Sequence, residues 1–144
     1  MHNGGMRLVI RGRELPGVSH LGHRRIGVAL QVRTDPVGVV AGDATNARWE
    51  TDVAVVGDDF RGPAVHGRRG ERFVYLTWGD LSDDGFAMFR RAKLMLSRVD
   101  AALVHEAAVD GRCLVADVVL TDDRGGPRCA RVDPPAVRWS VEAA

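Results

Sequence analysis

The chain has 144 residues, of which 45% are hydrophobic and 27% are charged, with 20 basic side chains against 19 acidic ones. This composition is typical of one globular domain, which we expect over residues 1–144. The formal net charge of +1 argues against a dedicated nucleic-acid-binding protein, because phosphate binding usually leaves a clear basic excess or a basic stripe.

The compartment is inferred from targeting signals and cysteine content. Charges interrupt the apolar runs, which fall far short of the roughly 20 apolar residues that a spanning helix needs. Residues 1–6 have neither the basic nor the apolar stretch of a secretory signal. Only Cys113 and Cys129 are present, too few for a disulfide framework. We therefore expect a cytoplasmic protein with no membrane partner, and the sequence leaves homo-oligomerisation open.

Strand-like alternation dominates the first half of the chain. Apolar residues occupy every second position at 8–10, 26–32 and 49–56, as in strands with one buried face. A turn-rich loop is expected between the first two, over 15–25. The segment 72–78 carries apolar side chains on both of its faces, namely Val74, Leu76 and Trp78 on one and Phe73, Tyr75 and Thr77 on the other. This pattern predicts a central strand covered on both sides.

The period then changes to that of a helix. Six apolar residues fall within about 120° of a helical wheel: Met88, Phe89, Ala92, Met95, Leu96 and Val99. The spacing predicts an amphipathic helix over 83–99, with Phe89, Ala92 and Leu96 buried. Its polar face, with Arg90, Arg91, Lys93 and Arg98, would suit RNA or an acidic partner, or is simply solvated. A second short helix is expected directly afterwards, capped by Asp100 and ended by Gly111.

The C-terminal third returns to strands, over 113–120, near 129–132 and around 137–141. A hairpin turn is expected between the first two, at Asp-Asp-Arg-Gly-Gly-Pro. If Thr121 and Pro127 flank that turn, Cys129 lies opposite Val119 and about 20 Å from Cys113 along a strand. A disulfide between these cysteines is then excluded, because bridged Cα atoms lie within about 7 Å of each other.

The order of strands, helix pair and strands predicts the fold class. We expect an α+β protein with a mainly antiparallel, strongly twisted sheet of about seven strands, packed against one amphipathic helix and a second short helix. An alternating parallel sheet would require helices between successive strands, which the first half of the chain does not contain.

Several separated motifs carry a resemblance to a known family. The central one is FRGPAVHGRRGERFVYLTWG at 60–79, followed by MFRRAKLML at 88–96. Shorter motifs are Leu15-Pro16-Gly17, Gly42-Asp43-Ala44 with Trp49, and Pro134-Pro135 with Trp139. Over nearly its whole length the chain resembles an uncharacterised bacterial family, the domain of unknown function numbered 5990. The resemblance implies no particular activity, because none is established for the family.

The candidate binding site is the glycine- and arginine-rich segment 60–72 with the strand after it. Arginine forks match carboxylate and phosphate groups, and the intervening glycines let backbone amides face a ligand. The candidate ligand-binding residues are Arg61, His66, Arg68, Arg72 and Tyr75. A structural alternative is that Arg61 and Arg72 pair with Asp58, Asp59 or Glu71 and brace a turn. Phe73 and Tyr75 either line a pocket next to this loop or pack under the helix pair as part of the core.

Other chemistries have weaker support. The spacing from Gly62 to Gly67 lacks the Lys-Ser/Thr pair and the following helix of a phosphate-binding loop. His20 and His23 lie in a loop without further ligands at recognised spacing. No Gly-x-Ser-x-Gly motif is present, so nucleophilic catalysis has no recognisable elbow. We expect no metal and no cofactor, and no catalytic residue is assigned.

Three classes of function stay open. We favour a small binding module that recognises an anionic ligand or acidic segment through residues 60–72. The alternatives are an enzyme of unidentified reaction and a structural or protein-interaction module. Convergence of Arg61, His66, Arg72 and Tyr75 in a pocket with a further acid or nucleophile would favour the enzyme.

Overall fold

Strands make up most of the chain in the computed structural model, which describes residues 4–13, 15, 25–42, 45–82, 85–122, 130–131 and 137–144. The elements in chain order are β1 (Gly4–Arg13), β2 (Arg25–Val32), β3 (Asp35–Gly42), β4 (Asn46–Val56), β5 (Asp59–Arg61), β6 (Phe73–Ser82), β7 (Gly85–Met95), α1 (Ala101–Asp110), β8 (Cys113–Val119), β9 (Thr121–Asp122), β10 (Ala130–Arg131) and β11 (Val137–Glu142).

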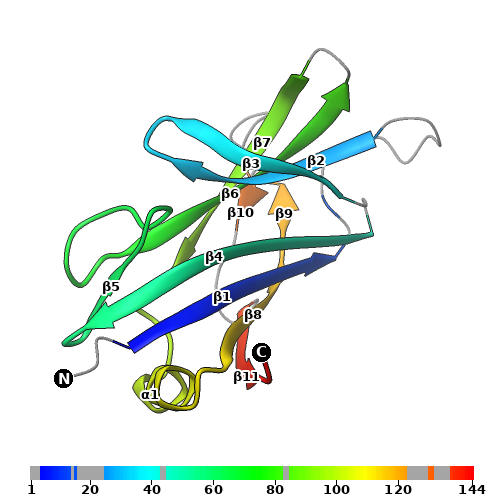
Figure 1. The fold of residues 1–144 in the computed structure, drawn as a ribbon. Coiled ribbons are helices and arrows are strands. Elements are labelled where there is room, and N and C mark those ends of the chain that lie inside the picture. Colours follow the sequence, from blue (N-terminus) through cyan, green and yellow to red (C-terminus); the bar gives the residue numbers. More distant parts are fainter. Residues whose placement is uncertain are drawn as a thin grey trace.

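Two sheets face each other. One has five strands in the order β11-β8-β1-β4-β5, and the other has four in the order β3-β2-β6-β7. A short β9-β10 pair is separate from both. Neighbouring strands are antiparallel except β1 and β8, which run parallel. Figure 1 shows the four-stranded sheet above the five-stranded one, with α1 at one end of the stack.

The core lies between the sheets and follows from the alternation in the sequence. In β4 every second residue from Ala47 to Val53 is buried, so one face points inward and the other carries charges. Trp49 of β4 meets Trp78 of β6 edge to face, with ring centroids 6.2 Å apart. The Trp49 indole N–H donates to the carbonyl of Thr77 at 3.0 Å. This buried hydrogen bond joins one sheet to the other.

The amphipathic helix expected over 83–99 is wrong. Residues Gly85–Met95 form β7, which pairs with β6 in antiparallel register. At its end, the buried residues Ala92 and Leu94 alternate with outward-facing neighbours as in any half-buried strand, and Leu96, directly after the strand, continues the pattern. The side chain of Phe89 lies outside the described residues.

The apolar residues of this segment fit the period of a helix and also that of a strand. Ala92 and Leu96 are four residues apart, which places them on one face of a helix and also on one face of a strand. The alanines, leucines and methionines around them favour a helix intrinsically. Pairing with β6 overrides that preference, because it gives partners to the backbone groups on one edge of the segment and buries Leu94 as well.

The second predicted helix is confirmed as α1. The side chain of Asp100 caps it by accepting a hydrogen bond from the Ala102 N–H at 2.9 Å, and Gly111 ends it in the left-handed conformation with φ of 62°. Val104 and Ala107 are its buried residues. Both signals are local, so they identify this helix without knowledge of its partners.

The predicted fold class is wrong in its architecture. The described part of the chain is mostly β, with two stacked sheets of five and four strands and one helix, in place of a single sheet of about seven strands with two helices. Three strands of these sheets are absent from the prediction, namely β3, β5 and β7, and the residues of β7 are those expected to form the helix.

A bulge explains why β3 shows no simple alternation. Val37 pairs with Leu30 and Val40 with Val28, and the register shifts between them. Two residues of β3 thus lie opposite one residue of β2, with Gly38 at a φ of 71° as bulges often require. Val37 and Val40 consequently share one face although they are three positions apart.

Several predictions fall wholly or partly outside the described residues. They concern Pro16, Gly17, His20, His23, Asp43, Ala44, Cys129, Pro134 and Pro135. Cys113 is a half-buried free thiol.

The predicted C-terminal hairpin register is wrong. In the structure Arg131 lies opposite Thr121, four positions along from the predicted register. A turn-prone sequence fits loops of several lengths, and the pairing of the flanking strands selects among them.

No helix in the described residues is long and apolar enough to cross a bilayer.

Candidate functional site

Two of the predicted site residues, Arg61 and Arg72, converge on one carboxylate. Arg72 donates from Nε to Oδ1 of Asp59 at 3.0 Å and from Nη2 to Oδ2 at 3.1 Å. Arg61 donates from Nε to Oδ2 at 3.0 Å. The Asp59 side chain is only 3% exposed, and the hydrogen bonds from Arg72 lower its pKa. These contacts are those of the structural alternative, in which the arginines brace a turn.

The loop between β5 and β6 is held by its backbone and by the same arginine. Arg72 Nη1 donates to the carbonyl of Gly67 at 2.5 Å. Gly67 has a φ of 92°, and a Cβ there would lie 2.5 Å from the carbonyl oxygen of Glu71. Only glycine fits this position. Arg69 pairs with Asp58 at 3.0 Å on the exposed side of the loop.

His66 and Tyr75, two further predicted site residues, come together on the outer face of the four-stranded sheet. A backbone bridge ties His66 to Phe73, with N···O distances of 2.8 and 3.1 Å. The imidazole stacks on the Phe73 ring at 5.8 Å between centroids and lies 5.3 Å from the Tyr75 ring. His66 Nε2 lies 2.7 Å from the carbonyl oxygen of Gln31. Since a carbonyl only accepts, Nε2 carries hydrogen and donates to it.

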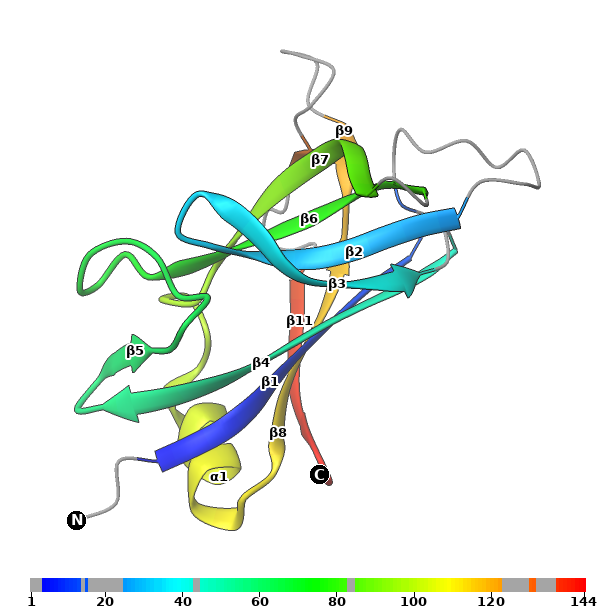
Figure 2. The same ribbon diagram turned by 45° about the horizontal axis from the view of Figure 1, so that its top comes forward.

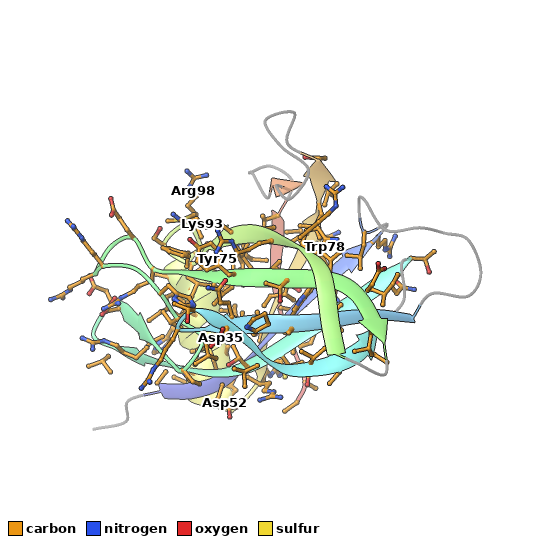
Figure 3. The ribbon with its side chains drawn as sticks, turned by 90° about the horizontal axis from the view of Figure 1, so that it is seen from above. Asp35, Asp52, Tyr75, Trp78, Lys93 and Arg98 are labelled. Atoms are coloured by element: carbon orange, nitrogen blue, oxygen red, sulfur yellow. The ribbon has the colours of Figure 1, made fainter. Side chains whose placement is uncertain are left out.

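Two cations from β7 lie over these rings. The Arg91 guanidinium carbon is 4.4 Å from the centroid of Tyr75, and Lys93 Nζ is 3.9 Å from that of Phe73. Such contacts attract the cation to the ring face. Arg91 also donates to Oε1 of Gln31 at 3.3 Å. Figure 3, which looks onto this sheet, shows Lys93 beside Tyr75 and Arg98 close by. We call His66, Phe73, Tyr75, Arg91 and Lys93 the aromatic–basic face.

The charges of this face differ from those on the outer face of the other sheet. There, the described ion pairs join arginines to carboxylates, and Arg7 and Arg48 share Glu50. The pairs are Arg7 with Glu50 and Asp52, Arg48 with Glu50, and Arg11 with Asp117 and Glu142. Among the described residues no carboxylate pairs with Arg91 or Lys93. Within the described part of the chain, the positive charge of the aromatic–basic face is therefore not balanced by a paired carboxylate.

Part of this face is predictable from the sequence. His66 and Tyr75 are among the predicted site residues and Phe73 is a candidate pocket residue, whereas Arg91 and Lys93 were expected on the polar side of a helix. Their alternation with buried Ala92 and Leu94 was the signal for a strand that would bring them onto the same face as Tyr75. Arg68, also selected, is exposed in the loop beside this face.

The arrangement suits binding better than acid–base chemistry. The described partner of the His66 ring is a backbone carbonyl, whereas a catalytic histidine is normally oriented by a carboxylate or paired with a nucleophile. No group of three potential metal ligands occurs among the described residues. Unpaired cations beside flat rings can hold an anionic group and pack against whatever carries it.

Comparison with known proteins gives a family but no characterised relative. No curated protein and no solved structure matches the chain. A family model does match, over residues 6–142 and thus nearly the whole length, and its description is a family of unknown function. The resemblance seen in the sequence motifs is confirmed: the chain belongs to the family of unknown function DUF5990.

Proposed function

We propose that the protein is a small binding module that recognises an anionic ligand on its aromatic–basic face. The observation that carries the proposal is that Arg91 and Lys93 lie over aromatic rings without a carboxylate partner in the described residues. A cation held in place and left uncompensated attracts anions at long range and binds them at contact. His66, Tyr75 and the exposed Arg68 complete the binding surface.

An extended acidic segment of a partner protein is the ligand that best fits this surface. Arg91 and Lys93 project from the same face of β7, so their side chains begin about 7 Å apart. Acidic residues at alternate positions of an extended peptide have the same spacing. The rings of Phe73 and Tyr75 add an apolar surface between the charges. We propose that this recognition takes place in the cytoplasm.

A fluorescently labelled peptide rich in alternating glutamates tests the proposal by fluorescence anisotropy. We expect binding that weakens at least tenfold between 50 and 200 mM NaCl, because exposed charges are screened over about 10 Å at these salt concentrations. Arg91→Gln and Lys93→Gln should each weaken binding several-fold. Arg138→Gln is the matched control, since Arg138 is an exposed arginine on β11 of the other sheet.

The outcomes separate the possible ligands. Equal loss with Arg138→Gln would mean that only net charge matters, and it would overturn the proposed site. A thermal-shift panel of inorganic phosphate, nucleotides and small carboxylates is the second arm. If a phosphate compound stabilises the protein and the acidic peptide does not bind, the acidic-segment assignment is overturned.

A further inference from the structure

A cavity of about 670 Å³ lies between β3 and β4, on the inner side of the four-stranded sheet. Its volume falls within the range of about 300–1,000 Å³ typical of small-molecule sites. Its floor is apolar and comes from both sheets, with Val28 and Leu30 of β2 and Trp49 of β4. The aromatic–basic face is on the other side of the same sheet, so the two sites are separate.

The cavity exists because the sandwich is open along this side. β3 ends the four-stranded sheet, and β5 pairs with β4 only at 54–56. The rest of β4 therefore has no neighbouring strand on that side among the described residues. In Figure 2, β3 lies above β4, and β5 lies beside the arrowhead end of β4.

Two valines of β3 face the cavity without being covered. Val37 and Val40 pair with core residues of β2, so they point to the inner side of their sheet. They are nevertheless 56% and 55% exposed. Both line the cavity together with the buried residues of its floor. An inward-facing apolar surface that stays exposed is typical of a binding site.

One wall of the cavity is polar and offers hydrogen-bond donors. Arg7, Arg48 and Glu50 line it, although their side chains lie on the outer side of the five-stranded sheet. The cavity therefore reaches around the edge of β4 that β5 leaves unpaired. Both oxygens of Glu50 already accept hydrogen bonds, Oε1 from Arg48 Nε at 2.6 Å and Oε2 from Arg7 Nη2 at 3.2 Å. Each guanidinium has five N–H groups, and Nη1 of Arg48 has no acceptor among the described residues. Arg7 also pairs with Asp52 at 3.0 Å, so two carboxylates balance the two guanidiniums, and what the wall offers a ligand is unused N–H donors, for which a carboxylate is a strong acceptor.

We propose that this cavity binds an amphipathic monocarboxylate, a molecule with an apolar chain of medium length and one carboxylate. The chain packs against Val37, Val40 and Trp49 and covers the exposed valines. The carboxylate accepts hydrogen bonds from the free donors of Arg48 and Arg7. The cavity combines an apolar lining with unused N–H donors. A ligand with an apolar chain and a carboxylate matches each of these two features. This inference does not rest on the proposed function.

Decanoate is the probe, and titration calorimetry on the full chain is the measurement. Butyrate has the same head group and six fewer methylenes, and should bind more than about 1,000-fold more weakly or not measurably, since each buried methylene strengthens binding about fourfold. Decanol has the same chain and no charge, and should bind about tenfold more weakly than decanoate. Trp49 lines the cavity, so its fluorescence should change with decanoate and not with butyrate.

Val37→Glu places a charge in the apolar part of the cavity, and we expect it to weaken decanoate binding at least tenfold. Val119→Glu is the matched control, because Val119 is 57% exposed and lies on β8, outside the cavity lining. Urea melts establish that both variants fold. Arg48→Gln should remove most of the preference for decanoate over decanol, and Arg138→Gln, at an exposed arginine of β11 outside the cavity lining, should leave decanoate binding unchanged.

Three results would overturn the proposal. One is equal binding of decanoate and decanol to the unmodified protein. Another is equal loss of binding in the Val37→Glu and Val119→Glu variants. The third combines two observations: decanoate does not bind, and analytical ultracentrifugation shows a concentration-dependent dimer that Val37→Glu abolishes. That result would mean that a second copy of the chain occupies the opening.

Discussion

At the scale of single residues, Asp59 decides what the arginines around it can do. Its carboxylate is buried, and it accepts hydrogen bonds from both Arg61 and Arg72. A guanidinium held in this way is less able to bind a ligand than one without a carboxylate partner. In the sequence, Asp58, Asp59 and Glu71 are all close to these arginines. Only the folded β4–β5 hairpin shows that Asp59 is the carboxylate to which both arginines donate hydrogen bonds.

Asp59→Asn should lower the free energy of unfolding at pH 7, because it removes the charge that both arginines bind. The pKa of Asp59 is lowered in the folded protein, chiefly by the hydrogen bonds from Arg72. Its stabilisation is therefore complete above the pKa of the unfolded chain, near 3.9, and is lost as pH falls through the lower folded value. The difference between wild type and Asp59→Asn in urea melts should shrink from pH 7 to pH 3.

The control for this prediction is Asp58→Asn. Asp58 pairs with Arg69, but the two side chains are 85% and 75% exposed, and exposed pairs contribute little. We expect a smaller loss of stability than with Asp59→Asn. A loss that is the same at pH 7 and pH 3 for Asp59→Asn would mean that the carboxylate charge does not stabilise the hairpin.

At the scale of elements, the contrast between α1 and β7 shows which signals are local. The helix α1 is delimited by Asp100 and Gly111, and both act within one turn of the chain. The strand β7 has no such delimiting signal, and its composition favours a helix. Its conformation depends on β6, with which it pairs residue by residue. Whether a segment of this composition forms a strand is therefore decided by its neighbour.

Leu94→Ala distinguishes the strand from the helix that the sequence suggested. Leu94 is 1% exposed in β7, and truncating a buried leucine costs about 2–5 kcal/mol. On the predicted helix Leu94 was not part of the buried stripe, and the same substitution would cost little. Lys93→Ala is the control, because Lys93 is exposed, and it should change the urea midpoint only slightly. Equal midpoints for the two variants would contradict the assignment of β7.

At the scale of the whole molecule, the two sheets carry different surfaces outward and share one core. The five-stranded sheet bears paired charges, and the four-stranded sheet bears the aromatic–basic face. Between them, Trp49 and Trp78 pack edge to face. Because Trp49 also donates a hydrogen bond across to the Thr77 carbonyl, it ties the sheets together by packing and by a polar contact.

Trp49→Phe should destabilise the protein by about 1–3 kcal/mol, the cost of leaving a buried hydrogen-bonding group unsatisfied. The lost ring volume adds to this cost. Trp139→Phe is the control, because Trp139 is only half-buried on β11 and should cost less. Urea unfolding followed by circular dichroism measures both variants. A smaller loss with Trp49→Phe than with Trp139→Phe would contradict the role of Trp49 in joining the sheets.

The sequence by itself determined the features that depend on short stretches of chain. The family follows from the motifs around residues 60–79, the helix α1 from its caps, and most strands from alternating apolar residues. Tertiary structure decided the rest, namely the division into two sheets, the strand β7, and the meeting of Arg91 and Lys93 with Phe73 and Tyr75. The physical reason is that a strand is stabilised by a partner distant in sequence, whereas a helix satisfies its backbone within its own turns.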